Sequence, residues 1–232
     1  MYRGFRAPSL NELYRPFRVG NVVTEGNAAL GPERLLGGEL GLNHEVSPAL
    51  FWRATAFWDS LEEPIANVTI SQTPALITRQ RQNLGQARIR GVGLEADYRP
   101  VPPLRLQASY LLSDARVEEF PADPTIEDNW LPQVPRNRVS LRLDYLNPRL
   151  LNVSLQGRYE GSRFDDDRNE LPLDSLFVVD LSLDRPLGDT FGAFLSVQNL
   201  FDYRYAVQVT PVELQGLPIT VTAGLRLELG PR

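Results

Sequence analysis

The chain has 232 residues, of which 42% are hydrophobic and 23% charged, so it is neither disordered nor fibrous. It has no cysteine and one histidine, which excludes disulfides, thiolate metal sites and sites built from several histidines. All 24 basic residues are arginine, and the net charge of -5 gives no electrostatic reason to expect nucleic-acid binding. No stretch approaches 18 consecutive apolar residues, which excludes a transmembrane helix but not a transmembrane β-barrel.

Alternation of apolar and polar residues at period two runs through most of the chain and predicts strands with two unlike faces. In Arg138–Tyr145, for example, the apolar residues all fall on one face and the polar residues on the other. Most of the segments approach the ten or so residues that cross a bilayer as a tilted strand, and no long helix is predicted. Nine segments carry the pattern: Leu36–Val46, Leu50–Trp58, Arg90–Tyr98, Leu104–Ser113, Arg138–Tyr145, Leu151–Glu160, Phe177–Arg185, Phe191–Val197 and Ile219–Leu229.

The connections between these segments alternate strictly between short and long. A membrane barrel of up-and-down topology has short turns on the periplasmic side and long loops outside, whereas a Greek-key sandwich has no reason to alternate. The short connections lie near Ser47-Pro48, Arg99–Pro103, Asn147-Pro148 and Leu187–Asp189, and the long, polar ones cover 60–85, 113–136, 161–175 and 201–217.

The two faces of the strands allow two interpretations. In a soluble β-sandwich the apolar face is a dry core, and in a membrane barrel it meets lipid while the polar face lines a wet lumen. Aromatic residues favour the barrel, because membrane barrels carry aromatic girdles at both interfaces. Tyr98 and Tyr145 precede short turns, and Trp58, Tyr110 and Tyr159 lie near long loops. The fold class predicted is therefore all-β, an antiparallel up-and-down transmembrane β-barrel segment.

Five segments, in order along the chain, resemble the C-terminal part of TonB-dependent outer-membrane receptors: GFRAPSLNELY, NAALGPERLLGGELGL, ARIRGVGLEADYRP, LPQVPRNRVSLRLDY and VQNLFDYRYAV. The resemblance implies a barrel of twenty-two strands behind a plug. Residues 1–232 are therefore expected to be the C-terminal portion of such a barrel, with nine strands, the stub Met1–Arg6 and no plug domain, as in a fragment or truncated product. The family's usual terminal aromatic residue is missing from Leu229-Gly230-Pro231-Arg232.

The function that the resemblance implies is energy-coupled uptake of a scarce ligand, such as a ferric siderophore or cobalamin, across the outer membrane of a Gram-negative bacterium. The implied partners are outer-membrane lipid and the TonB-ExbB-ExbD complex, which would act through the plug. No cofactor, enzymatic activity or nucleic-acid partner is expected. Two alternatives remain open at this point: a small outer-membrane barrel enzyme, and a soluble β-sandwich binding module.

Few residues point to chemistry. His44, near a short turn on the apolar parity, is expected to be an interfacial residue because no acid and nucleophile accompany it. Asp165-Asp166-Asp167, with Arg168 and Glu170, is expected to form a solvated loop, a weak calcium site being the alternative. We assign no catalytic residue and no metal ligand. Aromatic and basic residues of the long loops could contact a ligand, but none of them is assigned as a binding residue: Arg79, Arg81, Phe120, Trp130, Phe164, Tyr203 and Tyr205.

Charges of both signs are spread along the polar face of many strands. Because the signs are interspersed, they predict a hydrated ionic network rather than a pair of catalytic carboxylates. The charged residues are Arg53, Glu95, Asp97, Arg138, Arg142, Asp144, Arg158, Glu160, Asp180, Asp184, Arg226 and Glu228.

Overall fold

The computed structural model describes residues 1–147, 149–188 and 190–227. Its main element is one antiparallel sheet that contains all nine predicted strands and the predicted N-terminal stub. In spatial order the strands are β1 (Tyr2–Arg6), β4 (Glu33–Ser47), β5 (Leu50–Glu62), β8 (Gln86–Val101), β9 (Leu104–Glu119), β10 (Asn137–Tyr145), β11 (Asn152–Glu160), β14 (Leu176–Leu187), β15 (Phe191–Gln198) and β18 (Thr220–Leu227).

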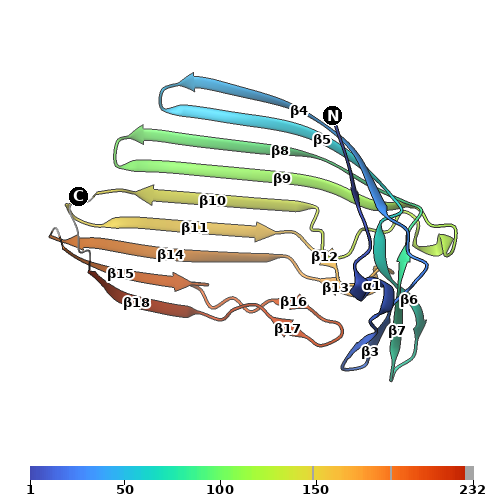
Figure 1. Cartoon of the computed structure of the whole chain (residues 1–232). Coiled ribbons are helices and arrows are strands. Elements are labelled where there is room, and N and C mark those ends of the chain that lie inside the picture. The colour runs from blue at the N-terminus through green and yellow to red at the C-terminus, as the bar shows by residue number, and fades with distance from the viewer. Residues whose placement is uncertain (148, 189, 228–232) are drawn as a thin grey trace.

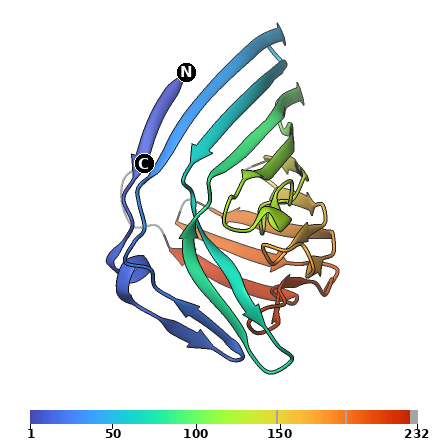
Figure 2. The ribbon, with the colours of Figure 1, turned by 90° about the vertical axis from the view of Figure 1, so that its right-hand side faces the viewer.

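The sheet is open (Figures 1 and 2). Within the described part of the chain, β1 pairs only with β4 and β18 only with β15, so the two edge strands do not meet. Figure 2 shows the strands curving round as part of a wall, with the first and last of them apart. The predicted open edge is confirmed for Thr220–Leu227, whereas Glu228 and Leu229 of that predicted strand, residues 230–232, and the turn residues Pro148 and Asp189 lie outside the described residues.

The register of the strands places apolar and aromatic residues side by side on one face of the sheet, called here the apolar face. Tyr110 pairs with Val139, Val139 with Tyr159, and Tyr159 with Phe177, which makes one aromatic-rich row across β9, β10, β11 and β14. Among the described residues no second layer covers the side chains of this face, and Leu141 is 53% exposed. A single-layer sheet with an uncovered apolar face contradicts the β-sandwich, in which a second sheet would cover it.

The opposite, polar face carries the predicted ionic network. Arg142 bonds Asp144 at 2.9 Å on β10, and the ion pair between Arg226 and Asp184 joins β18 to β14 at 3.3 Å. The arginines of these pairs are about half exposed, so water shares in the network. Further pairs on this face join Arg53 to Glu95, Asp97 to both Arg99 and Arg105, and Arg158 to Glu160.

The strands β5, β8 and β9 extend further than predicted, because the character of the two faces is exchanged near their ends. Up to Leu112 the even positions of β9 are mostly apolar, but Asp114 and Arg116 continue them with charges. The odd positions change the other way, since Ala115 and Val117 are 0% and 3% exposed. The prediction of loops from residues 60 and 113 onward is therefore wrong for residues 60–62 and 113–119, which remain strand.

The long connections contain secondary structure that the sequence did not predict. The connection from β1 to β4 and the connection from β5 to β8 contribute the strands of a second, four-stranded sheet, in the order β2-β3-β7-β6, next to the short helix α1 (Leu10–Tyr14). No helix among the described residues is long and apolar enough to cross a membrane. The other elements are β2 (Phe17–Val19), β3 (Val22–Glu25), β6 (Ile65–Gln72), β7 (Ile77–Asn83), the 3-10 helix η1 (Pro124–Ile126), and two hairpins, β12 (Arg163–Phe164) with β13 (Pro172–Leu173) and β16 (Ala206–Gln208) with β17 (Leu214–Gln215).

Candidate functional site

The long connections all lie at one end of the main sheet (Figure 1) and pack together into what we call the loop cluster, residues 7–32, 63–85, 120–136, 161–175 and 199–219. The cluster has a small hydrophobic core of its own, which joins the β6–β7 hairpin to the end of β9. The core residues are Val68, Leu84, Val117, Phe120 and Ile126, with Ala66 and Leu131 packed against them.

Three consecutive aspartates tie the connections to one another. Both carboxylate oxygens of Asp167 accept hydrogen bonds from Thr69 on β6, one from its backbone N–H at 2.9 Å and one from its hydroxyl at 2.8 Å. Asp166 accepts from the backbone N–H groups of Arg168, Glu170 and Leu171, which fixes the turn itself. These carboxylates therefore hold the shape of their own connection and attach it to β6.

Asp165 extends these ties to a third and a fourth connection. Its Oδ2 accepts from the backbone N–H groups of Val209 at 2.9 Å and Thr210 at 2.7 Å, and its Oδ1 accepts from the side chain of Gln133. The three aspartates are only 6–9% exposed. The expectation of a solvated loop is therefore wrong, because these carboxylates exchange water for buried N–H donors.

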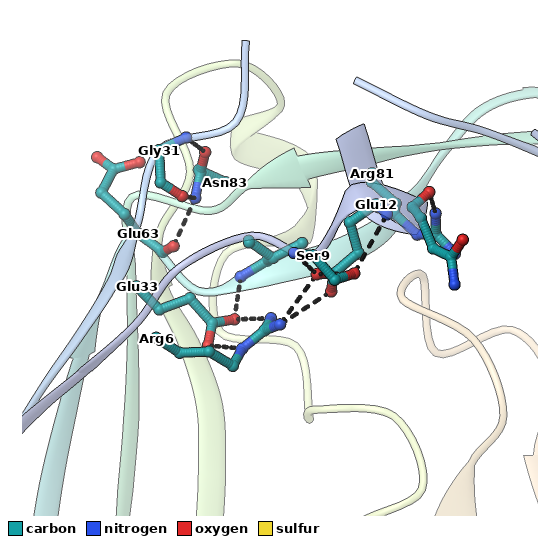
Figure 3. A network of polar contacts seen from close by, with 10 residues as sticks. Arg6, Ser9, Glu12, Gly31, Glu33, Glu63, Arg81 and Asn83 are labelled. Atoms are coloured by element: carbon teal, nitrogen blue, oxygen red, sulfur yellow. Dashed lines mark hydrogen bonds and ion pairs between the residues drawn. The ribbon is translucent and has the colours of Figure 1, made fainter. Parts of the chain in front are cut away.

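The N-terminal connection is fixed by a second polar network (Figure 3). Helix α1 begins with a capping box in which Ser9 and Glu12 bond each other's backbone N–H. Arg6 bonds Glu12 at 3.0 Å and Glu33 at 2.6 Å, and Glu33 also accepts from the N–H of Ile65 at 2.7 Å. The hydrogen bonds from Arg6 and from the Ser9 backbone lower the pKa of Glu12 from 4.5 to about 2.

The loop residues that the sequence singled out have different roles. Phe120 is 2% exposed and belongs to the core of the loop cluster. Arg81 lies over the ring of Phe17, 5.4 Å from its centroid, and donates to the carbonyl of Asn11 at 2.5 Å. Arg79 borders a cavity of about 380 Å³ shared with the three aspartates, and its Nε is buried without a hydrogen bond. Phe120 and Arg81 thus pack the loops.

Two of the aromatic residues lie at a larger cavity. Tyr203 and Tyr205 stack with their ring centroids 6.2 Å apart and their planes 18° apart. They line a cavity of about 800 Å³ between the β12–β13 hairpin and the β16–β17 hairpin, together with Arg204, Asp174 and other residues. Cavities that hold drug-sized ligands measure roughly 300–1,000 Å³. Tyr203 and Tyr205 therefore line a cavity of the size that holds a ligand.

The remaining candidates do not form a reactive centre. His44 packs edge-on against Trp52 on the apolar face, with ring centroids 5.8 Å apart, and its interfacial role stays a prediction. Among the residues that the structure describes, no three histidine, aspartate or glutamate side chains are grouped so that they could hold a metal ion. Sequence reasoning did not identify Gln133, Arg136 or Arg163, which lie around Trp130 and Phe164, because isolated polar residues in a connection carry no periodic signal.

A comparison with protein-family models matches residues 2–200 to the model described as "TonB dependent receptor-like, beta-barrel". The chain belongs to the TonB-dependent receptor family. The match covers β1 through β15 with their connections and stops before the β16–β17 hairpin and β18. The predicted resemblance and the predicted barrel segment are thus both confirmed.

Two curated relatives are similar to the receptor segment along its sequence. The vitamin B12 transporter BtuB of Photobacterium profundum is 24% identical over 209 residues, which is 89% of this chain and 31% of that protein. The ferrichrome outer membrane transporter/phage receptor of Escherichia coli (strain K12) is 34% identical over 129 residues, which is 52% of this chain and 17% of that protein. The segment thus spans less than a third of either relative.

Solved structures show the same fold. The ferric yersiniabactin uptake receptor FyuA from Yersinia pestis superposes with a TM-score of 0.70 at 22% identity, covering 86% of this chain and 30% of that one. In the structure of the present chain the main sheet is open, and its long loops lie together at one end of the sheet.

Proposed function

We propose that this chain supplies the C-terminal portion of the barrel wall, with its loops, to an outer-membrane receptor that takes up a scarce ligand. The apolar face would meet lipid, and the polar face with its ion pairs would line the water-filled interior. The loop cluster would then face the external medium, where it could capture the ligand. The chain would act by binding and positioning, not by catalysing a reaction.

One observation carries this proposal, which is the cavity of about 800 Å³ beside Tyr203 and Tyr205. It lies among long connections that are held in place by the contacts of Asp165 with Val209 and Thr210. A binding surface that is ordered before the ligand arrives loses less entropy on binding, which raises the affinity. Capture of a ligand from a dilute solution requires such a high affinity.

The names of the two curated relatives suggest the class of ligand that is taken up. One is named as a vitamin B12 transporter and another as a ferrichrome transporter. We therefore propose a ferric siderophore, cobalamin or a ligand of similar size as cargo. Release into the periplasm would be driven by the TonB-ExbB-ExbD complex, acting through a plug domain inside the complete barrel.

The proposed location is the outer membrane of a Gram-negative bacterium. Fractionation of cells tests it, because a receptor segment should sediment with the outer membrane and dissolve only in detergent. Recovery in the soluble fraction would contradict the proposed location. An enzyme of the outer membrane would have the same location, so fractionation does not distinguish it from a receptor. The uptake experiment makes that distinction.

Uptake is measured with radiolabelled ferric siderophores and cobalamin in cells that carry or lack the gene encoding this segment. Loss of uptake of one ligand is expected, both on deletion of the gene and on deletion of TonB. At limiting ligand, Tyr205→Ala is expected to lower uptake at least tenfold, whereas Tyr14→Ala, on the exposed surface of α1, should leave it unchanged. Uptake that does not depend on the gene for any ligand would contradict the proposal.

A further inference from the structure

A second, smaller cavity in the loop cluster has a distinct chemistry. It measures about 220 Å³ and lies between the connection that precedes β10 and the β12–β13 hairpin. Its lining combines two guanidinium groups, two aromatic rings and a hydroxyl group with apolar side chains, and it contains no carboxylate. The lining residues are Trp130, Val134, Arg136, Ser162, Arg163, Phe164 and Pro172, called here the Trp130 pocket.

Arg163 supplies a mostly buried guanidinium, one nitrogen of which makes no hydrogen bond. The residue is 8% exposed, and its Nε donates to Oε1 of Gln133 at 3.0 Å. Its Nη1 is buried and makes no hydrogen bond, although the carboxylate of Glu160 lies 3.6 Å away as an ion-pair partner. Buried polar groups in folded proteins are almost always hydrogen-bonded, and an unmade bond to a charged donor is costly. The guanidinium of Arg163 lines the pocket, where an acceptor atom of a ligand would add a second partner to Glu160.

Arg136 supplies a second positive charge to the lining of the pocket. Its Cζ lies 5.6 Å from the centroid of the Trp130 ring, and its side chain is exposed. Within the described part of the chain, no carboxylate is recorded in an ion pair with Arg136. The two arginines therefore give the pocket a positive character that the single carboxylate of Glu160 does not balance.

The aromatic wall is held rigidly. Asn169 bonds both backbone groups of Trp130, accepting from its N–H at 2.8 Å and donating to its carbonyl at 3.0 Å. Arg116 stacks on the indole ring with its Cζ 4.1 Å from the centroid. Because these contacts fix the ring before any ligand enters, the pocket has a preformed aromatic wall against which a flat group can pack.

We propose that the Trp130 pocket binds a planar aromatic carboxylate, which is a group of the captured ligand or a free anion of the same chemistry. The carboxylate would accept hydrogen bonds from Arg163 and Arg136, and the attached ring would pack against Trp130 and Phe164. A cavity of about 220 Å³ is smaller than those that hold whole drug-sized ligands, so it fits one such group. This inference rests on the proposed function, because it names the chemical class that the loops recognise.

The test measures direct binding of 4-fluorobenzoate to the full chain in detergent micelles by fluorine NMR. The neutral amide of the same shape, 4-fluorobenzamide, serves as the matched probe. Saturable binding of the carboxylate, at least tenfold tighter than that of the amide, is expected. No binding of the carboxylate, or equal binding of both probes, would overturn the proposal. Since the assay measures no transport, its failure leaves the proposed uptake function standing, and a failure of uptake leaves this result standing.

Variants of side chains in and beside the pocket assign the site. Arg136→Gln should weaken carboxylate binding at least tenfold, whereas Arg138→Gln, at an exposed position two residues away and outside the pocket, should not. Trp130→Phe keeps a ring and should retain binding better than Trp130→Leu. Arg136→Gln that binds 4-fluorobenzoate as tightly as the unaltered chain would overturn the assignment to this pocket.

Discussion

Thr69 and Asp167 lie 98 residues apart in the sequence and are joined by two hydrogen bonds, from the Thr69 backbone N–H and from its hydroxyl to the two carboxylate oxygens of Asp167. Thr69 belongs to the β6–β7 hairpin and Asp167 to the connection between β11 and β14. The guanidinium of Arg168 adds a third contact, to the Thr69 carbonyl at 3.2 Å. The pair therefore couples two loops that rise from strands well separated in the sheet.

Asp167→Ala should loosen this coupling. Loss of the carboxylate leaves the Thr69 N–H and hydroxyl without their acceptor, and an unsatisfied buried donor costs about 1–3 kcal/mol. We expect faster amide hydrogen exchange and faster proteolysis in residues 65–72 and 161–171, with the strands of the main sheet unaffected. Asp174→Ala, an exposed aspartate of the same connection, is the control. Equal protection of the loops in both variants would show that the contact does not hold them.

The sequence predicted the sheet well but not this contact, and the reason is physical. A strand repeats its pattern every two residues, so Val139, Leu141 and Leu143 identify a face without any knowledge of their neighbours. The three aspartates carry no such pattern. Whether Asp167 faces water or a buried N–H depends on a hairpin 98 residues away, and only the folded loops bring the two together.

The same reasoning explains the misplaced ends of β8 and β9. Asp114 and Arg116 interrupt the apolar parity, which a period-two analysis takes as the end of a strand. In the structure they pair as charges, at 2.9 Å, beyond the apolar part of the face. The opposite parity becomes the buried one because the loop cluster covers Ala115 and Val117.

Acid should release helix α1 through Glu12. Its pKa falls from 4.5 to about 2 on folding, mainly because Arg6 bonds the carboxylate. A group whose pKa is lowered by folding stabilises the folded state fully above its unfolded value, and this stabilisation is lost as the pH falls from 4.5 to about 2. Glu33, which also bonds Arg6, has a lowered pKa and acts in the same direction.

The measurement is the difference in thermal unfolding midpoint between the unaltered chain and Glu12→Gln, followed against pH. The variant should be the less stable at neutral pH, and the difference should shrink as the pH falls from 4.5 to about 2, because the carboxylate of the unaltered chain becomes protonated. Glu25→Gln, at an exposed position on β3, is the matched control. A difference that stays constant over this range would show that the charge of Glu12 does not contribute.

Accessibility to a thiol reagent should report the orientation. The chain has no cysteine, so single cysteines label without background. Ala75, at the exposed tip of the β6–β7 hairpin, represents the loop cluster, and Pro48 represents the short turn between β4 and β5. Asp166 is unsuitable because it is buried and fixes its own turn.

On intact cells producing the complete receptor, a membrane-impermeant reagent should label Ala75→Cys at once. Pro48→Cys should react only after the outer membrane is made permeable. The expectation follows from the long loops facing outward and the short turns facing the periplasm. The reverse pattern of labelling would mean that the orientation is inverted.

Arginine substitutions at two neighbouring positions of β10 should separate the two faces of the sheet. Leu141 lies on the apolar face, 53% exposed, between Ala108 on β9 and Gly157 on β11. If lipid covers this face, Leu141→Arg places a charge in hydrocarbon, which costs about 2–4 kcal/mol at the midplane of the bilayer. Ser140 points to the polar face, so the arginine of Ser140→Arg meets water.

Ser140 pairs with Arg158, so Ser140→Arg also creates a like-charge pair across two strands. Such cross-strand pairs change stability by roughly 0.2–1 kcal/mol, less than the cost of burying a charge in lipid. The free energy of unfolding in lipid bilayers, measured by urea titration of the complete receptor, should therefore fall clearly more for Leu141→Arg than for Ser140→Arg. The difference between the two variants in the free energy of unfolding should be smaller in detergent micelles, because their thin and deformable apolar layer lets water reach the arginine. Equal losses for the two variants in the bilayer would mean that lipid does not cover the apolar face.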